Sequence, residues 1–152
     1  ANGWTWLAKV RDHTWQCVQL SLTPGEELPS LPPHFGFPAR MRGADVTWRL
    51  VRECAGPGYF ICGDAAAIID PAASRGVARA LQSGIRAADL AADVCHGACN
   101  EIDAADIYRQ WLADAIISEA SQLAERYALQ EQAPDWVHHF SEKYAGDMAV
   151  KP

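Results

Sequence analysis

Hydrophobic and polar positions alternate in two runs near the start of the chain, residues 3–10 and 14–22, which are rich in Trp, Val and Leu. Between the runs lies the polar segment Arg11-Asp12-His13. A period of two is typical of a strand, and a short polar connection joins two strands into a hairpin. The pattern therefore predicts an antiparallel hairpin. Because the alternation is imperfect in the second run, we expect both faces of the hairpin to be partly covered.

The pattern then breaks between residues 23 and 44, where five prolines and three glycines occur. Proline fixes one backbone torsion and removes a hydrogen-bond donor, so this density excludes a long helix or a central strand. We expect a long connection. Two interpretations stay open for it: a loop that lines a functional site, or a surface connection between two sheet elements.

Three short segments follow. Alternate apolar residues in segment 45–54 predict a strand with one buried face. The Ala-Gly-Pro-Gly sequence of residues 55–58 predicts a turn. The apolar run at 59–62 is expected to form a strand that is covered on both sides.

A helical period predicts a first long helix from Ser74 to Cys95, stopped by Gly97. Very small residues recur at every fourth position of this helix: Gly76, Ala80, Gly84, Ala88 and Ala92. Glycine inside a helix costs about 1 kcal/mol relative to alanine, and close approach to another backbone is the usual compensation. We therefore expect this small-residue ridge to be pressed against a sheet, flanked by four larger apolar residues. These are Val77, Leu81, Ile85 and Leu90.

A second long helix is predicted to begin at a cap formed by Asp103 or its neighbour and to end before Pro134. Its apolar side includes Ile107, Trp111, Ile116, Leu123 and Tyr127. A last short helix is expected over residues 135–144. His138 and His139 fall in this segment and receive no role.

Composition narrows the class of protein. The 152 residues suffice for one domain with a core, and 49% of them are hydrophobic. The net charge of −6 comes without a clustered basic face, which argues against a nucleic-acid-binding protein. No apolar run approaches the roughly 20 residues that span a bilayer, and no secretory signal is apparent. We expect a cytoplasmic protein.

The cysteines support that expectation. There are five, at positions 17, 54, 62, 95 and 99, and an odd number in a chain of this size argues against a disulfide framework. The fragment Cys95-His96-Gly97-Ala98-Cys99 offers at most three soft ligands, and no second pair stands at the spacing of a zinc site. We therefore predict no metal and expect this fragment to end a helix.

The strongest candidate for chemistry is segment 59–77. It is expected to form a strand that ends in Gly63-Asp64, then a turn at Pro71, then a helix opened by Gly76. Open α/β sheets bind ligands at the carboxyl ends of their strands, where Asp64 would accept hydrogen bonds from sugar or polyol hydroxyls. Gly63 is expected to let a ligand approach the backbone closely.

The helix that follows presents unpaired N–H groups near Gly76 and Val77. Those groups and the helix dipole favour an anion, or a ring that becomes negative on reduction. A carboxylate for hydroxyls beside a helix N-terminus for negative charge suits a flavin dinucleotide. The alternative is a strand–turn–helix with an Asp on the surface.

The amino-acid sequence of this segment resembles that of a known family. Gly63-Asp64-Ala65-Ala66, Pro71, Ser74 and Gly76-Val77, followed by Ala80-Leu81 and Ser83-Gly84, are similar to the second half of the FAD-dependent aromatic hydroxylase superfamily. The similarity is greatest to its branch of flavin-dependent tryptophan halogenases and halogenase-like monooxygenases. It covers residues 45–92, with a weaker match at Gly3-Trp4-Thr5-Trp6 to a halogenase Trp-x-Trp-x-Ile-Pro segment.

The resemblance implies an α/β fold, namely part of a Rossmann-like, FAD/NAD(P)-binding flavoprotein. Residues 1–54 would belong to a substrate-side antiparallel sheet, 55–98 would carry the last strand and helix of the FAD-binding domain, and 99–152 would form a C-terminal helical region. The implied FAD contacts are Gly63, Asp64, Pro71, Ser74, Gly76 and Val77. Asp64 would hold the ribityl chain, and the Gly76 and Val77 amides would face the pyrimidine edge of the flavin ring.

The implied function is FAD-dependent oxygenation of an aromatic substrate through a flavin hydroperoxide. The flavin carries the chemistry, so we assign no residue as a catalytic acid or base. Trp4, Trp6 and Trp48 are candidates for stacking on the substrate, against the alternative of ordinary sheet packing.

Three other functions stay open. The first is halogenation, with halide beside residues 74–77. It is weakened because Ala8-Lys9 replaces Ile-Pro and Ala73 stands where tryptophan halogenases carry glutamate. The second is maturation of a partner protein by modification of its tryptophan, and the third is a non-catalytic fragment. Arg75 could attract a halide, pair with an acidic substrate or with flavin phosphate, or cap a carbonyl.

One expected motif is absent from the sequence. Flavoproteins of this superfamily begin with a strand, a Gly-x-Gly-x-x-Gly turn and a helix that bind the ADP half of FAD, and no such unit occurs here. We therefore expect a C-terminal fragment that needs a separate dinucleotide-binding half as its partner and is inactive alone.

Overall fold

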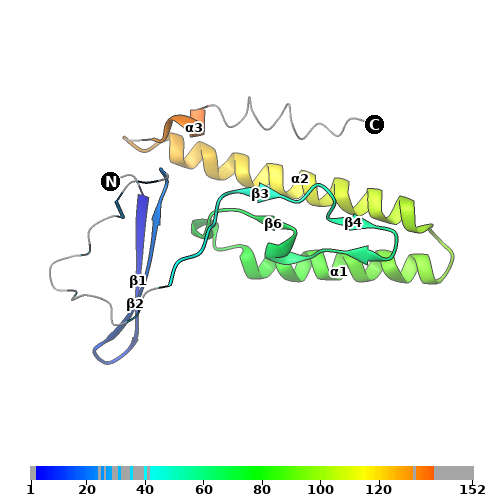
Figure 1. Cartoon of the computed structure of the whole chain (residues 1–152), viewed down its shortest axis with the longest axis horizontal. Coiled ribbons are helices and arrows are strands. Elements are labelled where there is room, and N and C mark those ends of the chain that lie inside the picture. Colours follow the sequence, from blue (N-terminus) through cyan, green and yellow to red (C-terminus); the bar gives the residue numbers. More distant parts are fainter. Residues whose placement is uncertain are drawn as a thin grey trace. The chain divides into compact units, whose positions relative to one another are not determined.

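A computed structural model describes residues 3–23, 25, 27–28, 31, 35, 40, 42–131 and 133–138. The chain divides into two compact units, each considered by itself (Figure 1). Unit 1 contains Ala1–Gly43 and Glu125–His139, and unit 2 contains Ala44–Ala124 and Phe140–Pro152. The described part is mixed α/β, with two-stranded antiparallel sheets and two long helices.

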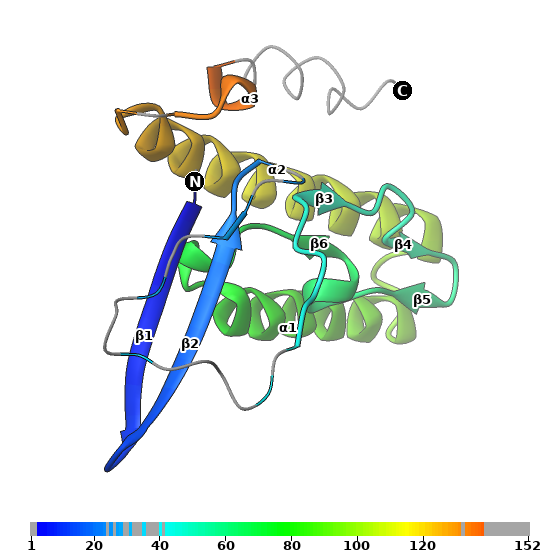
Figure 2. The same cartoon turned by 60° about the vertical axis from the view of Figure 1, so that its left-hand side comes forward.

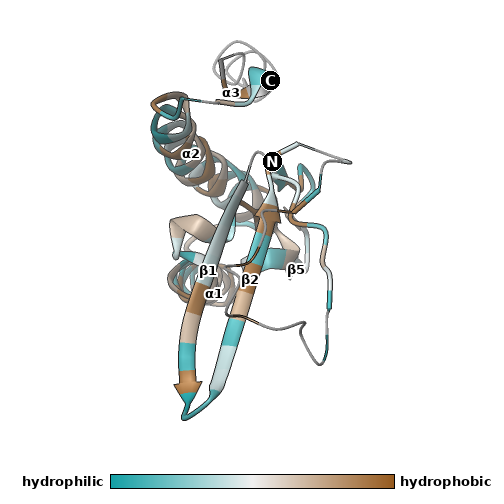
Figure 3. Ribbon diagram, turned by 90° about the vertical axis from the view of Figure 1, so that its left-hand side faces the viewer, coloured by the Kyte–Doolittle hydropathy of each residue, from teal (hydrophilic) through white to brown (hydrophobic). Residues whose placement is uncertain are grey.

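The predicted N-terminal hairpin is confirmed. Strand β1 (Gly3–Arg11) pairs antiparallel with β2 (Thr14–Ser21), so that Trp6 lies opposite Val18. The tight turn places His13 in the left-handed region at φ 60°, and a 2.9 Å ion pair between Lys9 and Asp12 closes it. Both strands carry hydrophobic and hydrophilic residues without a strict alternation (Figure 3).

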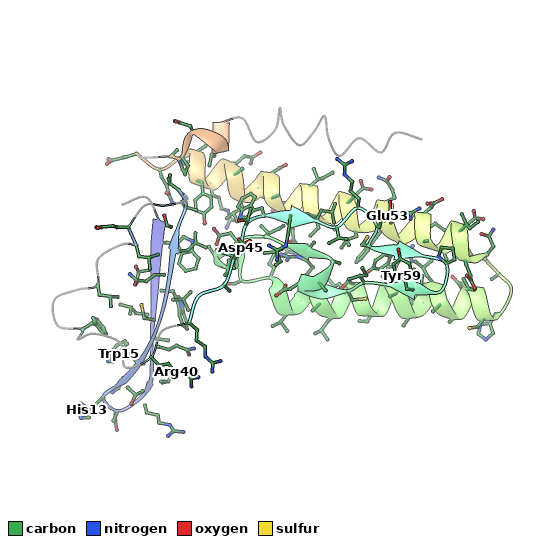
Figure 4. All side chains as sticks on the ribbon, in the orientation of Figure 1. His13, Trp15, Arg40, Asp45, Glu53 and Tyr59 are labelled. Atoms are coloured by element: carbon green, nitrogen blue, oxygen red, sulfur yellow. The ribbon has the colours of Figure 1, made fainter. Side chains whose placement is uncertain are left out.

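The expected cover over this hairpin is only partly present within unit 1. Trp6 and Trp15 are about half exposed, at 51% and 49%, and Trp15 makes an edge-on contact with Phe35 (Figure 4). Trp4 is half-buried, and its indole Nε1 donates a 3.2 Å hydrogen bond to Tyr127 Oη. The cover therefore lies over one end of the hairpin and leaves its tip exposed.

The predicted strand over 45–54 is wrong for most of its length. Only β3 (Arg49–Leu50) is a strand, and it pairs antiparallel with β6 (Ala67–Ile68). The alternation does correspond to burial, since Val46, Trp48 and Leu50 are half-buried between exposed neighbours. The pattern thus identified the inner face correctly, but residues 45–48 have no ladder partner in the described part of the chain.

The fully covered strand expected at 59–62 is also wrong. Strands β4 (Ala55–Gly56) and β5 (Tyr59–Phe60) form a minimal hairpin whose turn contains Gly58 at φ +83°. Tyr59 is 44% exposed, and its hydroxyl lies 3.4 Å from the Glu53 carbonyl oxygen (Figure 4). Every strand pair in the described residues is antiparallel, so these residues do not form a parallel nucleotide-binding sheet.

Helix α1 (Gly76–Cys95) ends where predicted and begins two residues after Ser74. The helix stops because Gly97 takes a left-handed conformation at φ +73°, its N–H bonding to Val94 O while the Ala98 N–H bonds to Asp93 O. These two bonds form a Schellman motif.

The buried face of α1 differs from the prediction. It carries Arg79, Ser83, Ala87 and Leu90. The expected flanking residues Val77, Leu81 and Ile85 are instead exposed, at 78%, 63% and 62%. The small-residue ridge shares that outward side, since four of its members are exposed and Gly84 is half-buried. The ridge is therefore not pressed against a sheet in the described part of unit 2. The polar Arg79 and Ser83 are buried because each has hydrogen-bonding partners inside.

Helix α2 (Glu101–Ala128) begins one turn before the predicted cap. Asn100 caps it, accepting the Asp103 N–H at 2.9 Å, while its amide donates to the Asp103 carboxylate at 2.7 Å. The inner face of α2 forms much of the core through Tyr108, Leu112 and Ile116. Within unit 2, α1 and α2 run side by side (Figures 1 and 2).

The last predicted helix is shorter where it is described. Helix α3 covers Asp135–His138, and the rest of the predicted segment, 139–144, lies outside the described residues. Val137 is buried in unit 1. Among the described residues, no helix combines the length and the apolar character needed to cross a membrane.

Candidate functional site

The predicted Gly63-Asp64 pair forms the start of a short 3₁₀ helix, η1 (Gly63–Ala65). Gly63 is buried with φ +62°, and its N–H donates a 3.0 Å hydrogen bond to Ser83 Oγ of α1. A Cβ at this position would lie 3.2 Å from the Cβ of Ala80. Glycine is therefore required here by its backbone torsion and by close packing on α1; the close approach of a ligand stays a prediction.

This packing places Asp64 at the beginning of α1. Asp64 is exposed, and its Oδ1 lies 4.0 Å from the position that a Cβ on Gly76 would occupy. In the described part of the chain its carboxylate accepts no hydrogen bond. The structure thus brings together the two features that the sequence singled out: the carboxylate and the helix start.

The path between them is set by a second 3₁₀ helix, η2 (Pro71–Ala73). The predicted turn-forming role of Asp70 is confirmed, because this buried carboxylate accepts the Ala72 N–H at 2.8 Å. Ser74 then takes a left-handed conformation at φ 53° and donates its N–H to Pro71 O at 2.9 Å. A non-glycine residue in this region is uncommon and marks a tightly specified turn.

The N-terminus of α1 has no side-chain cap. Arg75 occupies the cap position with φ −109° and ψ 0°, and its carbonyl accepts the Arg79 N–H at 2.8 Å. The first N–H groups of an α-helix have no partner inside the helix, so Gly76 and Val77 present donors to an outside acceptor. Both residues are exposed. The helix dipole adds partial positive charge at the same point.

The arrangement therefore combines acceptors and donors within one small area. The Asp64 carboxylate accepts hydrogen bonds, and the start of α1 donates them. Such a pair suits a ligand with hydroxyl groups on one part and negative charge or carbonyl oxygens on another. The accepting carboxylate fits the hydroxyl groups of a flavin's ribityl chain, and the donating N–H groups fit the edge of its ring.

A buried polar cluster holds the segment that precedes Gly63 against α2. The Tyr108 hydroxyl of α2 donates a 2.8 Å hydrogen bond to Ile61 O and lies 3.5 Å from Cys62 Sγ. Burial raises the pKa of the Tyr108 hydroxyl above its ordinary value, and the neighbouring Cys62 adds to this rise. Burial also raises the pKa of the Cys54 thiol. These contacts anchor the segment that leads into Gly63 onto α2.

Sequence reasoning missed an arginine–glutamate cluster. Glu119 of α2 receives Arg79 Nη2 at 3.0 Å and Arg75 Nε at 3.3 Å. The partner of Arg75 in the structure is therefore Glu119, which was not among the partners considered for it. Glu119 stands 40 or more residues from both arginines, and no local motif marks it.

The tryptophans proposed for substrate stacking are placed in two different units. Trp4 and Trp6 belong to unit 1, and Trp48 belongs to unit 2, where it is half-buried. Trp4 is engaged with Tyr127 through its indole nitrogen. Trp6 keeps half of its surface exposed and is the most accessible of the three.

No group of three or more potential metal ligands gathers among the residues that the structure describes. Cys95 is exposed at the last residue of α1, and Cys99 is half-buried in the turn that follows. The Cys95–Cys99 fragment ends the helix, as predicted. No protein-family model, curated protein or solved structure matches the chain.

Proposed function

We propose that this chain supplies the flavin-facing half of an FAD-dependent monooxygenase that acts on an aromatic substrate. The observation that carries the proposal is the placement of Asp64 beside the uncapped start of α1. Asp64 and the start of α1 both belong to the motif from Gly63-Asp64 to Gly76-Val77. This motif resembles the aromatic hydroxylase superfamily and its halogenase-like branch.

In this proposal each residue of the site has a binding role. Asp64 accepts hydrogen bonds from the ribityl hydroxyls, while the Gly76 and Val77 N–H groups donate to the pyrimidine edge of the flavin ring. Pro71 and Ser74 fix the turn that holds these donors in place. FAD itself supplies the oxygen chemistry when bound, and the chain binds and orients it.

The outward side of α1 supports the proposal that a dinucleotide-binding partner half exists. Val77 and Leu81 expose most of their surface along one face of the helix. The small residues beside them allow another backbone to approach closely. A sheet packed on this face would bury it and would carry the ADP-binding unit that the sequence lacks. The whole would then be a Rossmann-like flavoprotein that functions in the cytoplasm.

Oxygenation is favoured over halogenation by two observations. Ala73 of η2 offers only a methyl group where the resembling tryptophan halogenases carry a carboxylate. Arg75 is paired with Glu119, so its charge is not free for a halide. These observations do not separate oxygenation of a small aromatic molecule from modification of tryptophan in a partner protein.

Binding of riboflavin tests the proposal on this chain directly. Riboflavin carries the ring and the ribityl hydroxyls but omits the ADP half, which this chain is not proposed to hold. We expect riboflavin fluorescence to be quenched on titration with the chain, and Asp64→Asn to weaken this binding about tenfold, since hydrogen bonds to a charged group are among the stronger ones. Asp93→Asn, at an exposed position near the other end of α1, is the matched control.

Lumiflavin, which has a methyl group in place of the ribityl chain, separates the two halves of the site. Its binding should be unaffected by Asp64→Asn, because it offers that residue no hydroxyl. Equal loss of riboflavin and lumiflavin binding would show that Asp64 acts by maintaining the fold. Absence of any flavin binding would favour the non-catalytic alternative.

A further inference from the structure

A groove lies between α1 and α2 within unit 2, apart from Asp64 and η1. Its volume is ≈ 470 Å³, within the range of about 300–1,000 Å³ that is usual for small-molecule sites. Lining residues from α1 include Gln82, Ile85 and Arg86, and those from α2 include Trp111 and Ser118. The groove therefore combines apolar walls with several hydrogen-bonding groups.

Positive charges outnumber negative charges in and beside this groove: three arginines face two acidic residues. Glu119 lines it and is neutralised by the buried Arg79 at 3.0 Å and by Arg75 at 3.3 Å. Arg86 also lines the groove, and it makes no ion pair or hydrogen bond to any residue that the structure describes. Asp89, at the exposed margin, is the remaining acidic residue of the lining.

Arg86 also has an unusual environment for an arginine. Its Nε is buried and has no hydrogen-bond partner in the described part of the chain. A buried donor without a partner is unfavourable, so an acceptor that pairs with this guanidinium is expected to gain more here than at an ordinary surface arginine. A carboxylate is the best match, because its two oxygens fit the fork of N–H donors on one guanidinium.

The walls define the rest of the ligand. Trp111 is half-buried, and Ile85 is 62% exposed on the opposite helix, so each has a surface available to a ligand. Flat aromatic groups pack favourably against a tryptophan ring and an aliphatic side chain. We propose that this groove binds a small aromatic carboxylate, whose carboxylate group pairs with Arg86 and whose ring lies between Trp111 and Ile85. An inorganic phosphate fits less well, because it carries more charge and has no surface for these walls.

The proposal does not depend on flavin binding, because the groove and the Asp64 site share no proposed ligand contact. Benzoate is the probe, and NMR of the 152-residue chain is the measurement. The Trp111 indole N–H signal is assigned by its loss in Trp111→Phe. We expect benzoate to shift this signal in a saturable manner. Benzamide, which has the same shape without the charge, should bind at least about tenfold more weakly.

Variants identify the charge responsible. Arg86→Gln should weaken benzoate binding about tenfold or more, whereas Arg52→Gln, the same change at an exposed arginine outside the groove, should leave it unchanged. Asp89→Asn removes a repulsive charge at an exposed position and should tighten binding about two- to fivefold. If Arg86→Gln unfolds, the benzamide comparison and Asp89→Asn still test whether the negative charge of the ligand contributes to binding.

Three results would overturn the proposal. The first is that benzoate leaves the Trp111 signal unchanged. The second is that benzamide binds as well as benzoate, which would remove the role of the charge. The third is that Arg86→Gln and Arg52→Gln weaken binding equally, which would indicate non-specific attraction of anions to the surface.

Discussion

The Glu119 cluster gives a quantitative prediction about stability. Arg79 and Glu119 have side chains that are only 6% and 13% exposed, and their 3.0 Å contact is the most buried ion pair in the described part of the chain. Removing one partner of a buried pair leaves the other charge uncompensated, which costs about 3–5 kcal/mol. Glu119→Leu strands two arginines at once. We therefore expect it to lower the free energy of unfolding by at least about 3 kcal/mol.

The two arginines are predicted to contribute unequally. Arg75 is 54% exposed, so solvent screens its attraction to Glu119, and Arg75→Gln should cost no more than about 1 kcal/mol. Arg79→Met should lie between these values, because Glu119 then keeps Arg75 as a partner. The double variant Arg79→Met/Glu119→Leu should recover much of the loss, since apolar replacement of a whole buried pair is often neutral.

Urea unfolding followed by circular dichroism measures these differences. With a typical slope of about 1–3 kcal/mol per molar urea, a loss of 3 kcal/mol lowers the midpoint by about 1–3 M. The reasoning is refuted if Glu119→Leu and Arg75→Gln have the same midpoint. It also fails if the double variant is as unstable as the sum of the two single variants, because the cycle would then show no coupling.

Three further predictions concern the interior of unit 2. Tyr108→Phe removes the donor to Ile61 O and should cost about 1–2 kcal/mol by urea unfolding. Because burial raises the pKa of Tyr108 above its unfolded value of about 10, its contribution should be present below that pH and lost as the pH rises further; Tyr108→Phe should flatten this alkaline decline. Gly63→Ala should cost about 1–3 kcal/mol, because φ +62° is strained for alanine and the new Cβ meets Ala80; Ala80→Gly should restore only the part due to that contact. In the native protein, a thiol reagent followed by mass spectrometry should label the exposed Cys17 and Cys95 well before the buried Cys54, whose thiol pKa is raised by burial; equal labelling would contradict the burial.

The sequence predicted local features of the fold better than their surroundings. The hairpin and the end of α1 at Gly97 depend on neighbouring residues, and these predictions are confirmed. The strand predicted at 45–54 depended on a ladder partner, which an alternating pattern does not reveal. Only Arg49 and Leu50 find one in the described residues.

The buried face of α1 was mispredicted for a related reason. Apolar residues were expected to point inward, but the inner positions hold Arg79 and Ser83, each of which has a distant hydrogen-bond partner. Glu119, which holds Arg79, lies on another helix, so no pattern within α1 indicates it. Val77, Leu81 and Ile85 belong to the apolar pattern, but the described part of unit 2 leaves them exposed.

At the candidate site, the sequence predicted which parts meet. Asp64 and the start of α1 are adjacent because Gly63 packs on Ala80, a contact that requires glycine. The sequence did not predict this packing contact, because Ala80 lies on a helix that begins more than ten residues later. The turn-forming role of Asp70 followed from its place before Pro71, and it is confirmed.

The central claim is that the start of α1 binds the edge of a flavin ring, and backbone amide NMR tests it most directly. On titration of the ¹⁵N-labelled chain with riboflavin, we predict that the amide signals of Gly76 and Val77 shift most, because their N–H groups have no partner within the helix. The amides at the other end, near Cys95, should stay unchanged. Riboflavin binding that leaves Gly76 and Val77 unaffected, or that shifts signals evenly along α1, would contradict the account.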